Sequence, residues 1–136
     1  MTQSELESIR PDTAGLMASD TSGQVMGVIV TLAGGGSSKY HFMSRYFAPW
    51  NGIPEDPVTG MKREIKVLMY CKLFSYFAGS AHTVLAPYWR SVLGRDSMIA
   101  RQCSSRGGDL FLEISGNGRI EVAGESVIVM EGFIRT

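Results

Sequence analysis

The chain has 136 residues, 44% of them hydrophobic, with 13 acidic and 13 basic side chains. This length and apolar content suit a single domain with a workable core and exclude a disordered chain. Because the formal net charge is zero, there is no positive footprint for nucleic acid or for an anionic membrane, and neither partner is expected.

The cysteines and the N-terminus bear on the compartment. Cys71 and Cys103 are the two cysteines, which is too few for a disulfide framework and fits a reducing cytosol. No basic start followed by an apolar core is present, so no signal peptide is evident. The densest apolar run, 67–77, is too short to span a bilayer and contains Lys72. We expect a soluble cytoplasmic protein.

Two short helices are expected first. Ser4 can cap a helix that runs through Ile9, and Pro11 can open a second that ends near Ser19, since proline is tolerated in a first helical turn. Residues 20–23, Asp-Thr-Ser-Gly, then predict a turn.

Two strands and a loop should follow. Residues 25–33 are β-branched and apolar on both faces, as in a buried strand. A Gly-Ser connector, 34–38, leads to a second strand over 40–47, in which Phe42, Ser44 and Tyr46 share one face. The next ten residues, 48–57, contain three prolines and a glycine and should be loop.

Residues 81–93 predict a helix that is apolar on most sides, and such helices are usually buried. It should be the central helix of the domain, with a kink at Pro87, which cannot donate to the Thr83 carbonyl.

Further strands are expected after this helix. They are 98–103, 110–114, 119–122 and 127–134. Leu110, Leu112 and Ile114 alternate with Phe111 and Glu113, the pattern of a half-buried strand. The pair Asn-Gly at 117–118 predicts a two-residue hairpin turn.

A loop that ends in Glu55 and Asp56 carries the main candidate site. Thr59 and Gly60 follow it, and Ser80 stands at the start of the central helix. Backbone N–H groups at a helix start have no intrahelical partner and attract a carboxylate or phosphate. Asp56 could then orient a hydroxyl, an amine or a proton-carrying group beside the bound anion. The alternative is an ordinary helix start, because Asp-Pro followed by Thr, as at 56–59, is also common there.

Without residues 61–79 the chain would read Glu-Asp-Pro-Val-Thr-Gly-Ser-Ala-His, which closely resembles the signature of the phenazine biosynthesis-like (PhzF) family of isomerases. A second block, Gln-Cys-Ser-Ser-Arg-Gly-Gly at 102–108, stands where that family has its Arg-Gly-Gly segment. The resemblance runs from about Pro11 to the C-terminus outside 61–79. It corresponds to the second of the family's two lobes.

The resemblance implies a fold of the α/β (α+β) kind: one diaminopimelate epimerase-like lobe, 1–136, with a curved mixed sheet wrapped around a central helix. It also implies a cofactor-free isomerisation of a small acidic metabolite by proton transfer. By resemblance Asp56 is catalytic, and the substrate-binding residues are Thr59, Gly60, Ser80 and Ala81. Because the family takes its acid/base glutamate from the first lobe, we expect this lobe to be inactive alone. The alternative is a non-catalytic binding or dimerisation module. A homodimer is conceivable, since an unpaired lobe exposes its inter-lobe face.

Residues 61–79 have no counterpart in the family pattern and carry four basic side chains against one acidic. The codons at the two edges can contain GT at the start and CAG at the end, as the boundaries of an intron do. One hypothesis is therefore a retained intron or a gene-model error, and the other is a genuine insertion. Residues 62–77 are expected to be helical, since they lack Gly and Pro, and to form no strand of the sheet. The interval separates Gly60 from Ser80, so it is expected to impair ligand binding.

The remaining candidates have two interpretations each. His82 is either an acid/base group or a hydrogen-bonded core residue, and Cys103 is interpreted as a packing residue, since nothing resembles the cysteine motif of the related epimerases. Arg106, Gly107 and Gly108 either border the pocket or permit a tight bend. Glu55 should be solvated. No metal-ligand spacing and no nucleotide-binding glycine pattern occurs, so no metal or cofactor is expected.

Overall fold

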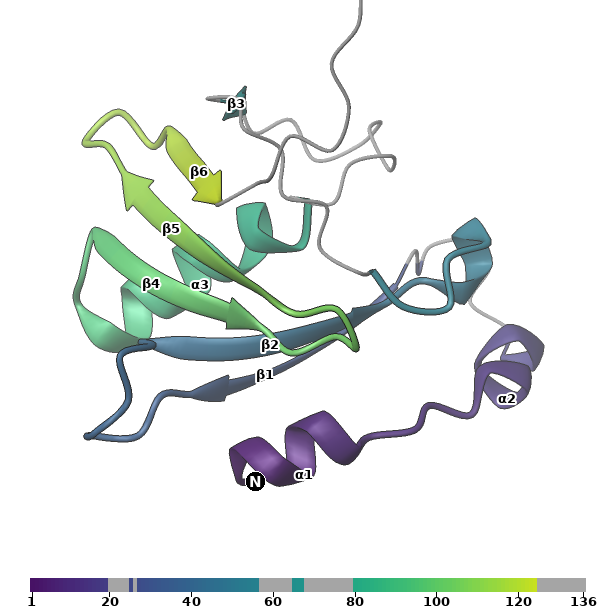
Figure 1. Ribbon diagram of the computed structural model, residues 1–136. Helices are drawn as coiled ribbons and strands as arrows, with labels where there is room; N and C mark the ends of the chain where they lie inside the picture. Colours follow the sequence, from purple (N-terminus) through teal and green to yellow (C-terminus); the bar gives the residue numbers. More distant parts are fainter. Residues whose placement is uncertain (20–24, 26, 57–64, 68–79, 125–136) are drawn as a thin grey trace, which may run out of the picture.

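The computed structural model describes residues 1–19, 25, 27–56, 65–67 and 80–124. The elements in chain order are α1 (Gln3–Ser8), α2 (Thr13–Ala18), β1 (Val28–Ala33), β2 (Phe42–Phe47), the 3-10 turn η1 (Pro49–Asn51), β3 (Ile65–Val67), α3 (Ser80–Leu93), β4 (Ser97–Gln102), β5 (Gly108–Ile114) and β6 (Ile120–Gly124) (Figure 1). The strands form one sheet in the order β1-β2-β4-β5-β6-β3. In this sheet β2 and β4 are parallel and the other neighbours are antiparallel. The predicted mixed sheet with a helix against it is confirmed.

The first helix is capped by Thr2, so the prediction of Ser4 as the cap was wrong. The Thr2 hydroxyl accepts from the Glu5 amide at 3.2 Å, and the Glu5 carboxylate accepts from the Thr2 amide at 2.6 Å. This reciprocal capping box satisfies two amides that a helix start leaves open. The second helix begins, as predicted, just after Pro11, with Asp12 as its cap.

The inner strand β2 is buried on both faces, whereas β1 is a half-buried edge strand and not the buried strand that was predicted. Successive side chains of β2 serve two clusters. Phe42 packs under α3, and Met43 packs with Leu6 of α1. Since neighbouring residues of a strand point to opposite faces, α1 and α3 lie on opposite sides of the sheet.

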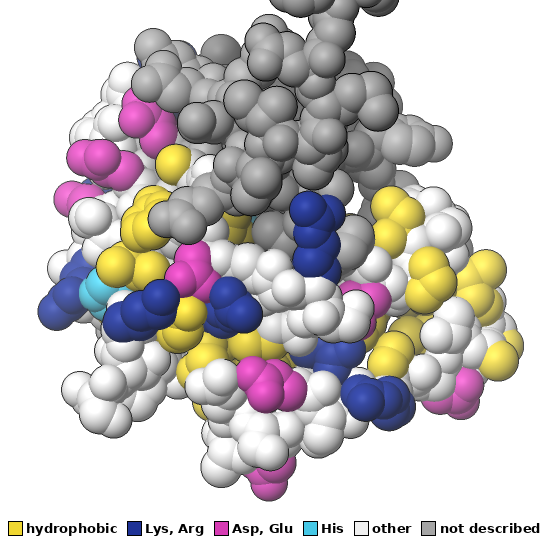
Figure 2. Space-filling model, viewed as in Figure 1, with side chains coloured by type: hydrophobic (Ala, Val, Ile, Leu, Met, Phe, Trp, Pro, Cys, Tyr) yellow, Lys and Arg dark blue, Asp and Glu magenta, His cyan; other side chains and the backbone are white. Residues whose placement is uncertain are grey.

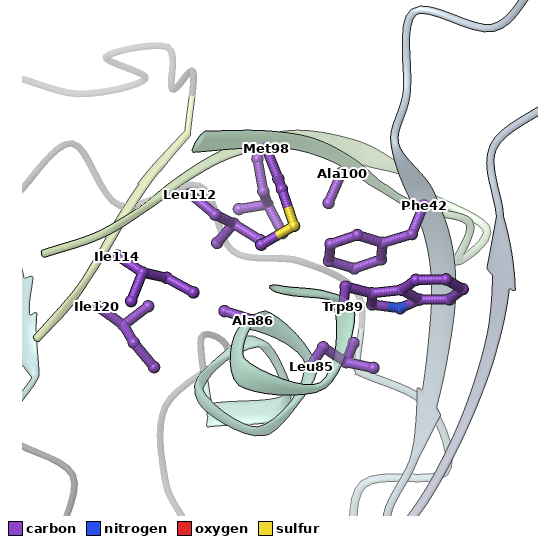
Figure 3. Packing of buried hydrophobic residues seen from close by; sticks show 10 residues of the cluster. Phe42, Leu85, Ala86, Trp89, Met98, Ala100, Leu112, Ile114 and Ile120 are labelled. Carbon is purple, nitrogen blue, oxygen red and sulfur yellow. The ribbon is translucent and has the colours of Figure 1, made fainter. Parts of the chain in front are cut away.

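The main core lies between α3 and the concave face of the sheet, which curves over the helix (Figure 3). Its buried members are Phe42, Leu85, Ala86, Trp89, Met98, Ala100, Leu110, Leu112, Ile114 and Ile120. Burial of each large apolar side chain contributes about 1.5–3 kcal/mol. The predicted alternation in β5 is confirmed, because Leu110, Leu112 and Ile114 are buried while Phe111 and Glu113 are exposed.

Only one face of α3 is covered, so the prediction of a helix buried on most sides is confirmed in part. Val84, Tyr88 and Val92, spaced four residues apart along the helix, are each more than half exposed. The helix continues through Pro87 from Ser80 to Leu93. The kink at Pro87 stays a prediction.

The hairpin between β5 and β6 has a three-residue loop, 116–118, rather than the predicted two-residue turn. The Ser115 amide donates to the Arg119 carbonyl at 2.9 Å, and the Gly118 amide donates back to the Ser115 carbonyl at 2.9 Å. Gly118 has φ 78°, a left-handed conformation that closes a three-residue loop of this kind. Asn117 therefore occupies a right-handed turn position ahead of that glycine.

Within the interval 61–79, residues Ile65–Val67 form the edge strand β3, antiparallel to β6. The expectation of a helix without any strand was therefore wrong at these three residues. A three-residue strand with a neighbour on one side joins the sheet without interrupting it. The rest of the interval, the turn predicted at 20–23 and the strand predicted at 127–134 lie outside the described residues.

Charged side chains of both signs are interspersed over the face shown in Figure 2. Among the helices that the structure describes, none has the length and apolar character needed to cross a membrane.

Candidate active site at the start of α3

The concave face of the sheet turns from apolar to polar at one end. Along β4 the inward residues are Met98, Ala100 and Gln102, and along β2 Phe42 is followed by Ser44. Ser44 and Gln102 are direct partners across the parallel β2–β4 pair. Both are buried, at 2% and 0% exposure. The core thus ends in polar side chains that are buried.

The main chain of Asp56 is fixed to this polar end from two sides. Its amide donates to the Tyr46 carbonyl at 2.9 Å, and its carbonyl accepts from Gln102 Nε2 at 2.8 Å. Asp56 is 6% exposed. Burial and the negative charge of Asp56 both raise the pKa of Tyr46, with burial the larger cause, so the carboxylate lies within electrostatic reach of that phenol.

The first turn of α3 stands beside the same strand. Ser80 begins the helix, as predicted, and Ala81 is buried. The His82 ring, fully buried, stacks on Phe42 with 6.1 Å between ring centroids. Burial lowers the pKa of His82 from 6.5 to about 4, so the ring is neutral at pH 7. The neutral imidazole therefore lies on Phe42, on the face of β2 that Ser44 shares two residues further along.

Two buried side chains of this region have polar atoms without a hydrogen-bond partner among the described residues: both ring nitrogens of His82 and Gln102 Oε1. Trp50 Nε1, in η1, is a further such atom. The prediction that His82 is a core residue is therefore confirmed for its burial, and among the described residues its ring nitrogens have no hydrogen-bond partner. Leaving such a group unsatisfied costs about 1–3 kcal/mol, and buried polar groups are normally met by water or a ligand. The amide oxygen can accept, the indole can donate and the neutral imidazole can do one of each.

Glu55 is paired with Arg45 and is not solvated as predicted. The Arg45 guanidinium meets the Glu55 carboxylate in a bidentate pair, at 2.7 Å from Nε and 2.8 Å from Nη2. Arg45 is 5% exposed. Sequence reasoning missed this pair because a strand residue and a loop residue ten positions apart give no periodic signal.

The Arg106–Gly108 segment forms the bend between β4 and β5. Gly107 has φ 66°, a left-handed conformation that favours glycine at this bend. Its other predicted role, at the border of the pocket, stays a prediction. The predicted packing role of Cys103 agrees with its place in the cluster with Leu6 and Met43. Burial is also the main cause that raises the pKa of its thiol.

Thr59 and Gly60 lie outside the described residues, so the structure places Asp56, Ser80 and Ala81 of the predicted site. Sequence reasoning overlooked Gln102 and treated Ser44 as an ordinary strand residue. The available signal was a polar side chain at a position where the strand period requires an inward, apolar one. Among the described residues, no three His, Cys, Asp or Glu side chains gather as ligands of a metal ion would.

The family model described as "Phenazine biosynthesis-like protein" matches residues 1–63, so the match stops just after the interval begins. The rat phenazine biosynthesis-like domain-containing protein is 41% identical over 135 residues, which is 97% of this chain and 40% of the rat protein. A Pseudomonas aeruginosa protein named an uncharacterized isomerase is 40% identical over 126 residues, 93% of this chain and 38% of that protein.

Solved structures give the same result. The crystal structure of a phenazine biosynthesis PhzC/PhzF protein from Clostridium difficile superposes with a TM-score of 0.70 at 31% identity, over 99% of this chain and 42% of that one. A PhzF-family structure from Enterococcus faecalis gives 0.66 at 33% identity, over 91% and 38%. The chain thus spans about 40% of the length of the curated relatives it matches. In sequence and in fold the chain is thus similar to proteins of the phenazine biosynthesis-like family, over part of their length.

Proposed function

We propose that this chain is the C-terminal lobe of a cofactor-independent isomerase that acts by proton transfer on a small acidic metabolite. The observation that carries the proposal is the buried Asp56, whose main chain is held by Tyr46 and Gln102 at the polar end of the core. Two relatives from Pseudomonas aeruginosa are named isomerases, which supports the reaction class.

In this proposal each group has a separate task. The open amides at the start of α3 bind the acidic group of the ligand, with Thr59, Gly60, Ser80 and Ala81 as the lining. Asp56 orients the carbon-bound or oxygen-bound proton that is to move. His82 stays neutral, so it can direct a hydrogen bond without adding charge.

The principal acid/base group should come from the remainder of the longer relatives, so the lobe alone should bind and not turn over. We expect the cytoplasm as its location, on the grounds of its cysteine content.

The binding step can be tested on the chain itself. Calorimetry during titration with succinate and with malate measures the affinity. In NMR spectra of the same titrations, the amide signals of the first turn of α3 should shift. Replacing Asp56→Asn should weaken binding about tenfold, which is 1.4 kcal/mol. Glu113→Gln, an exposed carboxylate on β5, is the matched control and should change nothing. Binding of neither acid, to the unmodified chain or to a variant that lacks residues 61–79, would refute the proposed function.

The interval 61–79 can be tested separately. A variant lacking these residues would join Gly60 to Ser80, and we expect it to bind the same acids more tightly than the chain as it stands. Equal affinity would contradict the idea that the interval impairs the site. The origin of the interval as a retained intron is a further proposal, and transcript reads across the junction decide it. A genomic sequence without GT and AG at the edges would exclude it.

The second candidate function, a binding or dimerisation module, is favoured by the exposed apolar residues Val84, Tyr88 and Val92 on α3. Such a surface on a soluble chain is a common contact site. Sedimentation equilibrium of the chain and of Tyr88→Glu distinguishes the two. A dimer that Tyr88→Glu dissociates, together with no acid binding, would favour the module.

A further inference from the structure

Arg45 uses its whole guanidinium group inside the protein. Besides the bidentate pair with Glu55, Nη1 donates to three main-chain carbonyls, those of Leu6 at 3.1 Å, Glu7 at 3.0 Å and Ile9 at 2.8 Å. A buried cation is tolerated only where its charge and its hydrogens are both met. Here one side chain of β2 joins the first helix to the loop that ends in Asp56.

The carbonyls at the end of α1 have local donors as well as Arg45. The Ile9 amide donates to the Leu6 carbonyl at 3.4 Å, and the exposed Arg10 donates to the carbonyls of Glu7 and Ile9 at 3.3 and 3.1 Å. Arg45 is the donor that comes from the sheet. The last carbonyls of a helix lack intrahelical partners and carry partial negative charge. The last turn of α1 has no basic residue of its own. A helix of six residues is also too short to be stable by itself, so it depends on tertiary anchors. Arg45 supplies the polar anchor, and the fully buried Leu6 supplies the apolar one.

The loop that follows β2 is attached to the sheet through two consecutive residues, Glu55 and Asp56. Glu55 is held by Arg45, which shares the outward face of the strand with Met43 and Phe47. The next residue, Asp56, is held by the Tyr46 carbonyl and by Gln102 of β4. Two consecutive residues are thus fixed by different elements, and one of the two attachments reaches through Arg45 to α1.

We propose that Arg45 is a positioning residue through which the seating of α1 sets the place of the Asp56 carboxylate. The importance of this for ligand binding rests on the function proposed above, while the mechanical coupling itself does not. Lysine cannot replace arginine in this role, because one ammonium group cannot meet a carboxylate side-on and three carbonyls at once.

The experiment is hydrogen exchange of single amides in the full chain. The Asp56 amide reports the loop through its bond to Tyr46, and the Leu112 amide in β5 reports the core. In Arg45→Lys we expect protection of Asp56 to fall by about tenfold or more while that of Leu112 stays unchanged. Leu6→Ala damages α1 and leaves the Arg45 and Glu55 side chains intact, and it should speed exchange at Asp56 in the same way.

The control is Arg90→Lys, which alters another arginine–carboxylate pair, to Asp96 at 2.6 Å, away from this loop. It should leave the Asp56 amide unchanged. Asp56 exchange within twofold of the unmodified chain in Arg45→Lys or in Leu6→Ala would overturn the proposal, as would an equal loss at Asp56 and Leu112. If Arg45→Lys unfolds the chain, Glu55→Gln decides by the same criterion.

The ligand readout separates this proposal from the function. In Arg45→Lys the affinity for malate should fall with the Asp56 protection, whereas Arg90→Lys should bind as the unmodified chain does. If no acid binds the unmodified chain or the variant that lacks residues 61–79, the proposed function fails and the exchange data still decide the coupling. If malate binds Arg45→Lys with unchanged affinity, the positioning role is refuted and the function stands.

Discussion

The core under α3 has two ends of opposite character. At one end Met98 and Leu112 pack with apolar side chains alone. Trp89 has one polar atom, Nε1, which donates at 2.9 Å to Thr31, the cross-strand partner of Ser44. At the other end His82 and Gln102 are equally buried but keep polar atoms that no described residue satisfies. Burial alone therefore does not separate folding residues from candidate site residues. Hydrogen-bond satisfaction does.

The two groups of residues have opposite effects on the free energy of the folded state. The satisfied end lowers the free energy of the folded state, since apolar area leaves water and few polar groups lose partners. The unsatisfied end raises that free energy, and natural proteins keep such groups mainly where a ligand or water meets them. Changes at the two ends should thus differ in whether stability or binding responds.

The largest effect is expected at the satisfied end. Leu112→Ala removes a side chain that is 2% exposed and should lower the free energy of unfolding by about 2–5 kcal/mol. Its neighbour Phe111 is 43% exposed, and Phe111→Ala should cost less than about 1 kcal/mol. Urea titrations of both variants measure the difference. Similar losses at the two positions would contradict the assigned faces of β5.

A lower pH should reduce the free energy of unfolding through His82. The pKa of His82 is about 4 in the folded chain against an ordinary 6.5, so the unfolded chain binds the proton more readily. Stability from this group is complete above pH 6.5 and falls as the pH drops towards 4, by about 3 kcal/mol in all. Urea titrations between pH 7 and pH 4 give the slope. His82→Leu should flatten it, and an unchanged slope in that variant would show that other groups cause it.

A smaller effect should follow loss of the partner of Trp89. Thr31→Val keeps the shape of the residue but removes the hydroxyl that accepts from Nε1 and donates to the Met43 carbonyl at 2.9 Å, leaving a buried donor unmet. We expect a loss of about 1–2 kcal/mol in the free energy of unfolding, without any change in malate affinity. A change in malate affinity here would mean that the two ends are not independent.

The smallest effect on stability should come from Gln102→Leu. This change removes the hydrogen bond to the Asp56 carbonyl but also removes the unmet Oε1, so the two effects partly cancel and the net change should be within about 1 kcal/mol. Malate affinity should nevertheless fall, because the Asp56 peptide loses its inner attachment. Thermal unfolding and calorimetry of the same samples measure both. A large loss of stability with intact binding would reverse the assignment of the two ends.

Local patterns made much of this architecture predictable. The period of two in β5 and the helix start at Ser80 were read from side chains within a few residues of each other. The predicted positions of β2 and β4 were right to within two residues for the same reason. The predictions that were wrong concern contacts between residues distant in sequence. β1 is apolar enough to be central but lies at an edge, because strand order is set by the whole chain.

For the site, the sequence pointed to Asp56 and Ser80 through a motif, and the motif could not name what holds them. Gln102 reaches Asp56 across 46 positions, and Arg45 reaches the α1 carbonyls across 36 to 39. Contacts of this length leave no periodic trace. The one local signal was a glutamine, Gln102, at a position where the inward face of β4 should be apolar, and this signal is visible in the sequence.

The parallel pairing of β2 with β4 has a thermodynamic corollary. The connection between them, from residue 48 to residue 96, holds 49 residues, and it would hold 30 without the interval 61–79. Closure entropy grows with the logarithm of loop length, so the added residues cost about 0.4 kcal/mol. The topology can therefore accommodate a passage of this length at little cost in loop-closure entropy. A variant lacking it should melt at nearly the same temperature while binding the same acids more tightly.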